Sequence, residues 1–323
     1  MAFLPSFTCR SPPFPIVSIL GDGYSPHVTM NTFISSRNPS RREFIRLAGA
    51  AGLGFACGAT ARAAAAAPPA LPSIEVEKVG WGGASTADIR AVLKSTASEL
   101  WRHCGPTRLE PLRVQHRKAG PITIFQRAPD GRVRIGLSPQ GQFWSQFAYQ
   151  FAHEFAHTLA AHTNDWKAKW HSATHANHWL EESIAETASL FAMRAMAKTW
   201  ETEPPYPNWK SYAPSLAKYV ADWMADPARQ RPAGQTFAAW FAAALPELRK
   251  NPVDRTRNAI IAQQLLPLFE REPSGWEAVT WLNLGKRVAD NPFPTHLAEW
   301  QEACPKERKK FVDALAGVFA VKL

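Results

Sequence analysis

One uncharged stretch of the chain contains two histidines and a glutamate at a spacing that suits metal chemistry. The helical pattern from about 143 to 162 includes His153, Glu154 and His157, an HExxH motif, and has no charged residue other than Glu154. Residues i and i+4 lie on the same face of a helix, so both imidazoles can reach one metal ion. Glu154 lies beside them, where its carboxylate can take a proton from water. The motif therefore predicts a buried helix that supplies two ligands of a zinc site.

Two histidines leave such a site short of a third protein ligand, for which the chain offers three sources. A metzincin-like spacing would need a histidine at position 163, but the chain has Thr163 there, and His162 is one position away. The second source is a set of histidines at helical spacing: His171, His175 and His178. The third source is a carboxylate of the next helical segment, Glu181 or Glu182.

The segment after the motif favours the carboxylate. Residues 144–192 resemble the gluzincin metallopeptidases, the clan of thermolysin-like and M1-aminopeptidase-like enzymes, whose second helix typically reads Trp-Leu-x-Glu-Gly-x-Ala. This chain reads Trp-Leu-Glu-Glu-Ser-Ile-Ala from Trp179, with Ser183 in place of the usual glycine. The alignment puts Glu182 in the ligand position, and Glu181 is the rival ligand.

The resemblance implies a role for each residue of the site. Zinc would be held by three ligands: His153, His157 and Glu182. Glu154 would be the general base, and Glu186, one helical turn beyond the third ligand, would orient a ligand histidine. The implied activity is hydrolysis of peptide bonds in a peptide or protein substrate. Two alternatives stay open: a non-catalytic zinc-binding module of the cell envelope, and a zinc hydrolase that acts on a non-peptide bond.

Two further features of the resembled clan have candidates in the chain. In that clan an edge strand above the active helix binds extended substrate, and Arg132–Leu137 is placed in the sequence to be that strand. A hydrogen-bond donor for the developing oxyanion is also expected. The sequence offers four candidates without choosing between them: Tyr206, Tyr212, His171 and His175.

The chain as a whole predicts an α+β fold, in which a zincin-like catalytic domain is followed by an all-helical C-terminal lobe. Pro121–Gln126 and Arg132–Leu137 flank a Pro-Asp-Gly turn, which predicts a β-hairpin. A small sheet with this hairpin and an edge strand, the HExxH helix, and a Glu-ligand helix from about 179 to 198 make up the predicted catalytic domain, residues 68–203. Residues 204–323 contain amphipathic segments separated by proline or glycine, which predicts the helical lobe.

The N-terminal segment resembles an export signal. Ser40–Arg46 is similar to the twin-arginine translocation motif, and the apolar run Leu47–Ala61 ends in small residues that a signal peptidase can cut. We therefore expect residues 1–29 to be a disordered upstream extension and residues 30–67 to be a signal peptide with an Ala/Pro linker. The resemblance implies passage through the twin-arginine translocase to the periplasm or the medium, with no stable membrane span after signal removal.

The charge of the chain bears on its partners, and its cysteines bear on disulfide formation. The chain has 37 Lys and Arg against 27 Asp and Glu, but residues 1–63 contain six of the arginines and two of the acidic residues, so the remainder carries +6. No dense basic stripe is present, so nucleic acid is not an expected partner. Loss of the signal removes Cys9 and Cys57 and leaves Cys104 and Cys304, whose pairing the sequence leaves open.

Overall fold

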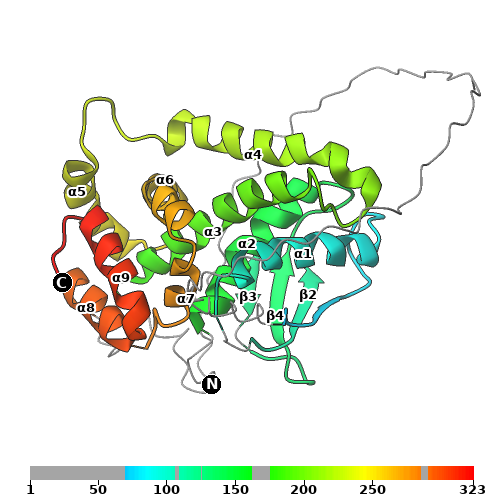
Figure 1. Ribbon diagram of the computed structural model, residues 1–323, viewed down its shortest axis with the longest axis horizontal. Coiled ribbons are helices and arrows are strands. Elements are labelled where there is room, and N and C mark those ends of the chain that lie inside the picture. Colours follow the sequence, from blue (N-terminus) through cyan, green and yellow to red (C-terminus); the bar gives the residue numbers. More distant parts are fainter. Residues whose placement is uncertain (1–69, 106–108, 125, 162–174, 285–289) are drawn as a thin grey trace, which may run out of the picture. The chain divides into compact units, whose positions relative to one another are not determined.

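A computed structural model describes residues 70–105, 109–124, 126–161, 175–284 and 290–323. The upstream extension, the twin-arginine segment and the linker up to residue 69 lie outside the described residues, as do His162 and His171. The described residues belong to one compact unit. Its fold is mixed α+β, with a small sheet and a helical remainder, as the sequence predicts (Figure 1). The division near residue 203 stays a prediction.

A four-stranded sheet lies in the first half of the described chain (Figure 1). Its spatial order is β1 (Ile74–Val76), β2 (Leu112–His116), β4 (Val133–Leu137) and β3 (Ile122–Ile124). β1, β2 and β4 are parallel, whereas β3 is antiparallel to β4. The antiparallel pairing of these two consecutive strands confirms the predicted hairpin. In its turn the Gly131 N–H donates to the Ala128 carbonyl at 2.9 Å, with Gly131 at a φ of 84° that favours glycine.

The expectation that Arg132–Leu137 forms an edge strand is wrong. β4 lies between β2 and β3, and backbone pairing continues on both of its sides. Its residues Val133, Ile135 and Leu137 are all buried, which suits an inner strand. β3 forms the edge on this side of the sheet, with β1 at the other edge, and β3 follows Pro121, whose missing N–H suits a strand that pairs on one side only.

Two long helices, α1 (Thr86–Trp101) and α2 (Trp144–Ala161), pack against the sheet, and a third, α3 (His178–Thr199), packs against these two helices. α1 contacts β1, α2 contacts β3 and β4, and α3 packs against both α1 and α2. α1 begins at Ser85, whose side chain caps the helix by accepting a hydrogen bond from the Asp88 N–H at 3.1 Å. The apolar side chains around the HExxH motif are buried, as its uncharged pattern predicts: Phe147, Phe151, Phe155 and Leu159.

The described chain after residue 203 is helical, which confirms that part of the prediction. Its elements are η3 (Pro207–Tyr212), α4 (Ala213–Ala225), η4 (Pro227–Arg229), α5 (Phe237–Lys250), α6 (Arg255–Arg271), α7 (Gly275–Val279), α8 (Phe293–Ala303) and α9 (Lys306–Val318). α4 and α6 pack against α3, and α7 contacts α2. α4, α6 and α7 therefore lie directly against the two helices that carry the candidate site.

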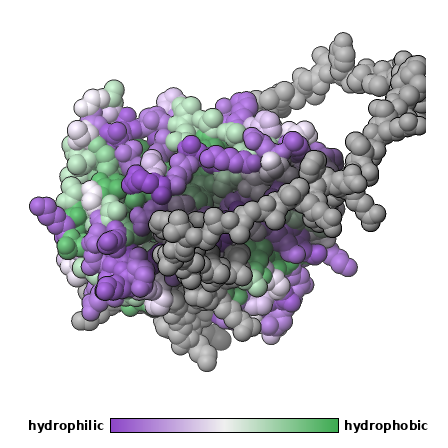
Figure 2. Space-filling model, viewed as in Figure 1, coloured by the Kyte–Doolittle hydropathy of each residue, from purple (hydrophilic) through white to green (hydrophobic). Residues whose placement is uncertain are grey.

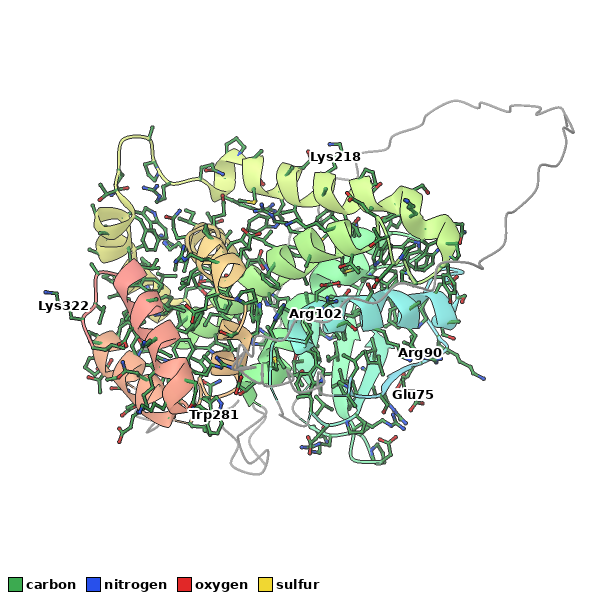
Figure 3. The ribbon with its side chains drawn as sticks, viewed as in Figure 1. Glu75, Arg90, Arg102, Lys218, Trp281 and Lys322 are labelled. Atoms are coloured by element: carbon green, nitrogen blue, oxygen red, sulfur yellow. The ribbon has the colours of Figure 1, made fainter. Side chains whose placement is uncertain are left out.

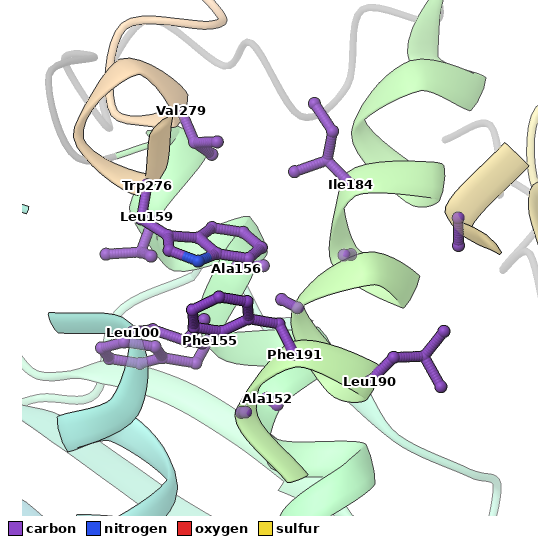
Figure 4. Packing of buried hydrophobic residues seen from close by; sticks show 14 of the residues in the cluster. Leu100, Ala152, Phe155, Ala156, Leu159, Ile184, Leu190, Phe191, Trp276 and Val279 are labelled. Carbon is purple, nitrogen blue, oxygen red and sulfur yellow. The ribbon is translucent and has the colours of Figure 1, made fainter. Parts of the chain in front are cut away.

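A continuous apolar core joins the two halves. Figure 4 shows Phe155 of α2 and Phe191 of α3 beside Trp276 of α7. The ring centroids of Phe191 and Trp276 are 5.3 Å apart, and Trp276 also stacks on Phe269 of α6 at 4.2 Å. All four side chains are buried. Buried aromatic side chains contribute large apolar areas to a core, so this packing helps to hold the short helix α7 in place.

Gly275→Ala is expected to destabilise this core. A Cβ atom at Gly275 would lie 2.2 Å from Cε2 of the buried Phe311 ring, so the ring or α7 has to move. Overpacking of this kind lowers the free energy of unfolding by about 1–3 kcal/mol, which a denaturant titration measures. Gly317→Ala is the matched control, because a Cβ there has no neighbour within 4 Å and alanine favours the helix. Two variants of equal stability would contradict this account of α7.

Cys104 and Cys304 are both buried, and no disulfide joins these two residues. Burial raises the pKa of both thiols, that of Cys304 to about 12. Both side chains are therefore protonated at neutral pH and act as small apolar groups.

The surface of the described chain mixes polar and apolar residues (Figure 2). Charged side chains such as Lys218 and Lys322 extend away from the ribbon (Figure 3), and Lys218 pairs with Asp222 across one turn of α4 at 2.7 Å. Four large apolar side chains are exposed among the described residues: Val79, Phe143, Val253 and Leu323. No helix in the described ranges is both long enough and apolar enough to cross a membrane.

Candidate metal centre

α2 and α3 bring three side chains with metal-binding atoms together. His153 and His157 lie one turn apart on α2, with ring centroids 5.1 Å apart, and Glu182 comes from the start of α3. One ring nitrogen of each histidine and one carboxylate oxygen of Glu182 all lie within 4.8 Å of one another. Donor atoms about 2.1 Å from a shared tetrahedral metal lie about 3.4 Å apart, so small side-chain movements would complete the coordination. Among the described residues this group is the one that could hold a metal.

Two further carboxylates of α3 determine which ring nitrogens face the centre. Glu186 Oε2 lies 3.2 Å from His153 Nδ1, and Glu181 Oε1 lies 2.7 Å from His157 Nδ1. A histidine that donates one N–H to a carboxylate keeps its other ring nitrogen available for a metal. That other nitrogen is Nε2 in both rings, and it lies 3.5 Å (His153) and 3.7 Å (His157) from the nearer Glu182 oxygen.

The adjacent glutamates, the two rival ligands, have different surroundings. Glu182 faces both Nε2 atoms, and its side chain is 17% exposed. Glu181 is only 2% exposed, and its oxygens accept hydrogen bonds from His157 Nδ1 and from Asn283 Nδ2, each at 2.7 Å. Neighbouring residues of a helix differ by about 100° in direction, whereas Glu186, one turn after Glu182, lies on a similar face. Glu182 therefore lies on the Nε2 side of the histidines, toward the centre, and Glu181 lies on the Nδ1 side of His157.

Glu154 is buried on α2, and the edge strand β3 contacts its carboxylate. The Thr123 hydroxyl donates to Oε2 of Glu154 at 2.9 Å and also lies 2.8 Å from its backbone oxygen. Both residues are 4% exposed. The HExxH motif identifies Glu154 in the sequence, but no local pattern identifies Thr123, because its contact depends on how the sheet packs against α2.

His178 adds a third imidazole beside the two histidines of α2. Its Nε2 lies 3.3 Å from Glu182 Oε1, and its Nδ1 lies 3.8 Å from Glu181 Oε2. The His175 ring centroid is 5.8 Å from that of His178 and 5.4 Å from that of His296 on α8. Of the three histidines predicted as alternative ligands, the structure thus places His178 against the candidate ligand Glu182.

Tyr206 and Tyr212, predicted as oxyanion donors, pack near the first residues of α2. Tyr212 Oη is 3.2 Å from both the backbone N and the Oγ of Ser145. Ser145 precedes His153 by eight residues, which is roughly 12 Å along a helix axis. Tyr206 borders a cavity of about 380 Å³ in the same region, whose lining is Asp88, Gln142, Trp144, Tyr206, Asn208 and Trp209. The structure does not bring either tyrosine to the three candidate ligands.

The carboxylates and imidazoles of the centre shift one another's pKa values. Burial raises the pKa of Glu182, but the charge of His157 and hydrogen bonds from neighbouring imidazoles outweigh it and hold that pKa well below its usual range. Burial lowers the pKa of His153, but hydrogen bonds to Glu182 and Glu186 outweigh it and raise that pKa to about 10. Tyr149 also donates a hydrogen bond to Glu186. The carboxylates therefore stay charged and favour the protonated imidazoles in the metal-free site, so metal binding would release these protons.

No family model, curated protein or solved structure matches the chain. The resemblance to the gluzincins therefore rests on residues 144–192 and on the side chains that these residues bring together. The three that carry it are His153, His157 and Glu182.

Proposed function

We propose that the chain is an exported zinc-dependent metallopeptidase. The observation that carries the proposal is the orientation of His153 and His157, each of which has Nδ1 beside a glutamate and Nε2 toward Glu182. Catalytic zinc sites use three protein ligands, including this combination of two histidines and one glutamate, and keep one position for water or substrate. The donor set therefore fits zinc.

The proposed mechanism assigns the proton transfers to Glu154. Zinc bound by the three ligands would supply a Lewis acid that polarises water and the peptide carbonyl. Glu154 accepts the proton of the attacking water at Oε1, the oxygen that Thr123 does not contact, and gives it to the nitrogen of the leaving amine. Thr123 holds the other oxygen, and Glu181 and Glu186 keep the histidines oriented.

The edge strand β3 supports an extended peptide as the substrate. An edge strand has backbone N–H and C=O groups that pair with no neighbouring strand, and a peptide segment can add to it as a further strand. Thr123, at the middle of β3, contacts the proposed general base Glu154. A peptide paired with β3 would therefore pass close to the carboxylate that moves the proton.

The twin-arginine segment supports a periplasmic or secreted location. The resembled export route carries folded proteins, so the chain would bind zinc before it leaves the cytoplasm. The proposed partners are the twin-arginine translocase during export and a peptide or protein substrate afterwards.

Zinc content and peptide cleavage test the proposal. Residues 68–323, purified without a chelator, are expected to contain about one zinc ion per chain by elemental analysis and to cleave members of a broad peptide library. Folded protein without zinc would contradict the zinc site. Zinc-loaded protein that cleaves no peptide would contradict the peptidase assignment and leave a zinc-binding module or a hydrolase of another bond.

Thr123→Val is expected to lower kcat about tenfold without changing zinc affinity. Valine keeps the β-branched shape of threonine but removes the hydroxyl that holds Oε2 of Glu154, a hydrogen bond that contributes about 1–1.5 kcal/mol. Initial rates on a cleaved library peptide measure the effect. Thr123→Ser keeps the hydroxyl and is the control. Equal kcat values for the valine and serine variants would show that this hydrogen bond does not position Glu154.

A further inference from the structure

Glu181 is a buried carboxylate that the proposed chemistry uses only as a support for His157. Both of its oxygens are engaged, because Oε1 lies 2.7 Å from His157 Nδ1 and Oε2 accepts a hydrogen bond from Asn283 Nδ2 at 2.7 Å. Asn283 is buried and lies in the turn that follows α7, within the helical second half of the chain. Asn283, 102 residues further along the sequence, thus contacts the carboxylate that orients the candidate ligand His157.

Asn283 is anchored to the two helices that carry the site. Its Nδ2 also lies 3.4 Å from the Ala160 carbonyl, near the end of α2. The turn itself is held in the core, where Trp276 and Val279 of the preceding helix lie beside α2 (Figure 4). Asn283 therefore bridges α2 and the carboxylate of α3 from a packed position, which favours one orientation of its amide.

The surroundings of Glu181 show what Asn283 prevents. Nδ1 of His178 lies 3.8 Å from Glu181 Oε2, the same oxygen that Asn283 holds. If the amide is removed, His178 Nδ1 remains beside this oxygen, and a rotation of the carboxylate toward His178 would draw Oε1 away from His157. A carboxylate shared between two imidazoles supports neither in a single orientation.

We propose that Asn283 is a positioning residue of the metal centre, which acts through Glu181 to hold His157 in its metal-binding orientation. The proposal rests on the proposed zinc site. By this proposal the helical second half of the chain contributes to the zinc site, although no residue of that half is among the three candidate ligands. Zinc affinity thus depends on Asn283 as well as on residues 144–192, which carry the resemblance to the gluzincins.

The zinc affinity of Asn283→Leu in the 68–323 protein tests the proposal. Leucine matches the size of asparagine and removes the N–H donor, so competition with a chromophoric chelator is expected to show about a tenfold to hundredfold weaker affinity for zinc. The visible spectrum of the cobalt-loaded variant is expected to shift as well, because the His157 ligand changes orientation. Asn177→Leu is the matched control, since the buried Asn177 amide donates to the Asn291 carbonyl at 2.7 Å without contacting a glutamate.

A double-mutant cycle shows whether Asn283 acts through Glu181. In a Glu181→Leu background, Asn283→Leu is expected to cause no further loss of zinc affinity. Additive losses would overturn the proposal, and so would wild-type affinity and spectrum in folded Asn283→Leu protein. Asn283→Ala provides the same comparison if the leucine variant does not fold. A wild-type protein that binds zinc but cleaves no peptide would end the peptidase assignment and leave this proposal in place.

Discussion

Replacing Glu154 by glutamine is expected to abolish peptide hydrolysis and to leave zinc bound. Glutamine has the same shape, and its amide oxygen can still accept the hydrogen bond from Thr123, but it cannot take a proton. A general acid–base group contributes about 10²–10⁴-fold to a rate. Because Glu154 serves both the attacking water and the leaving amine, we expect kcat to fall by about 10³-fold or more, measured as initial rates on a library peptide.

Two measurements make the Glu154→Gln result specific. Zinc content is expected to equal that of the wild type, because Glu154 is not among the three candidate ligands. Glu201→Gln, which removes an exposed carboxylate just after α3, is the control and is expected to keep wild-type activity. Full activity of Glu154→Gln would overturn the mechanism. Loss of zinc from this variant would mean that Glu154 helps to hold the metal.

Replacing Glu182 by alanine is expected to weaken zinc binding far more than replacing Glu181 by alanine. Zinc binding of about 12 kcal/mol, divided among the three protein ligands, is about 4 kcal/mol for each, or about a thousandfold in affinity. Glu182 faces both Nε2 atoms, so its removal takes away a ligand. Removal of Glu181 takes away the support of His157, a loss of about 10- to 100-fold.

Chelator competition on both alanine variants decides between the two glutamates. Their metal-free forms should be compared by thermal unfolding, because Glu181 is buried and its replacement also removes the partner of Asn283. If Glu181→Ala loses more zinc affinity than Glu182→Ala at similar stability, the third ligand is Glu181 and the alignment shifts by one residue.

The sequence predicts those parts of the site in which spacing along one helix determines geometry. His153 and His157 lie four residues apart, so their common face follows from helical periodicity alone. The same argument relates Glu182 to Glu186 on α3. Helical periodicity also predicts the helices of the second half of the chain.

The contacts that the sequence does not predict all cross between distant segments. The expected edge strand was β4, but strand order follows from how β2, β3 and β4 pair, which the local pattern of each strand does not specify. Thr123 reaches Glu154 only because β3 takes that edge. Asn283 reaches Glu181 only because the turn after α7 packs onto α2 and α3. Neither residue belongs to a motif.

Glu181, Glu182 and Glu186 come from α3, whereas His153, His157 and Glu154 come from α2. A slide of one helix along the other would therefore displace the third ligand and both histidine supports in a single movement. Small buried residues at this contact, such as Ala152 and Ala156 of α2 (Figure 4), set how closely the helices approach. Larger side chains at Ala152 and Ala156 are thus expected to be tolerated as poorly as substitutions of the ligands, although neither alanine has a side chain that can bind metal or transfer a proton.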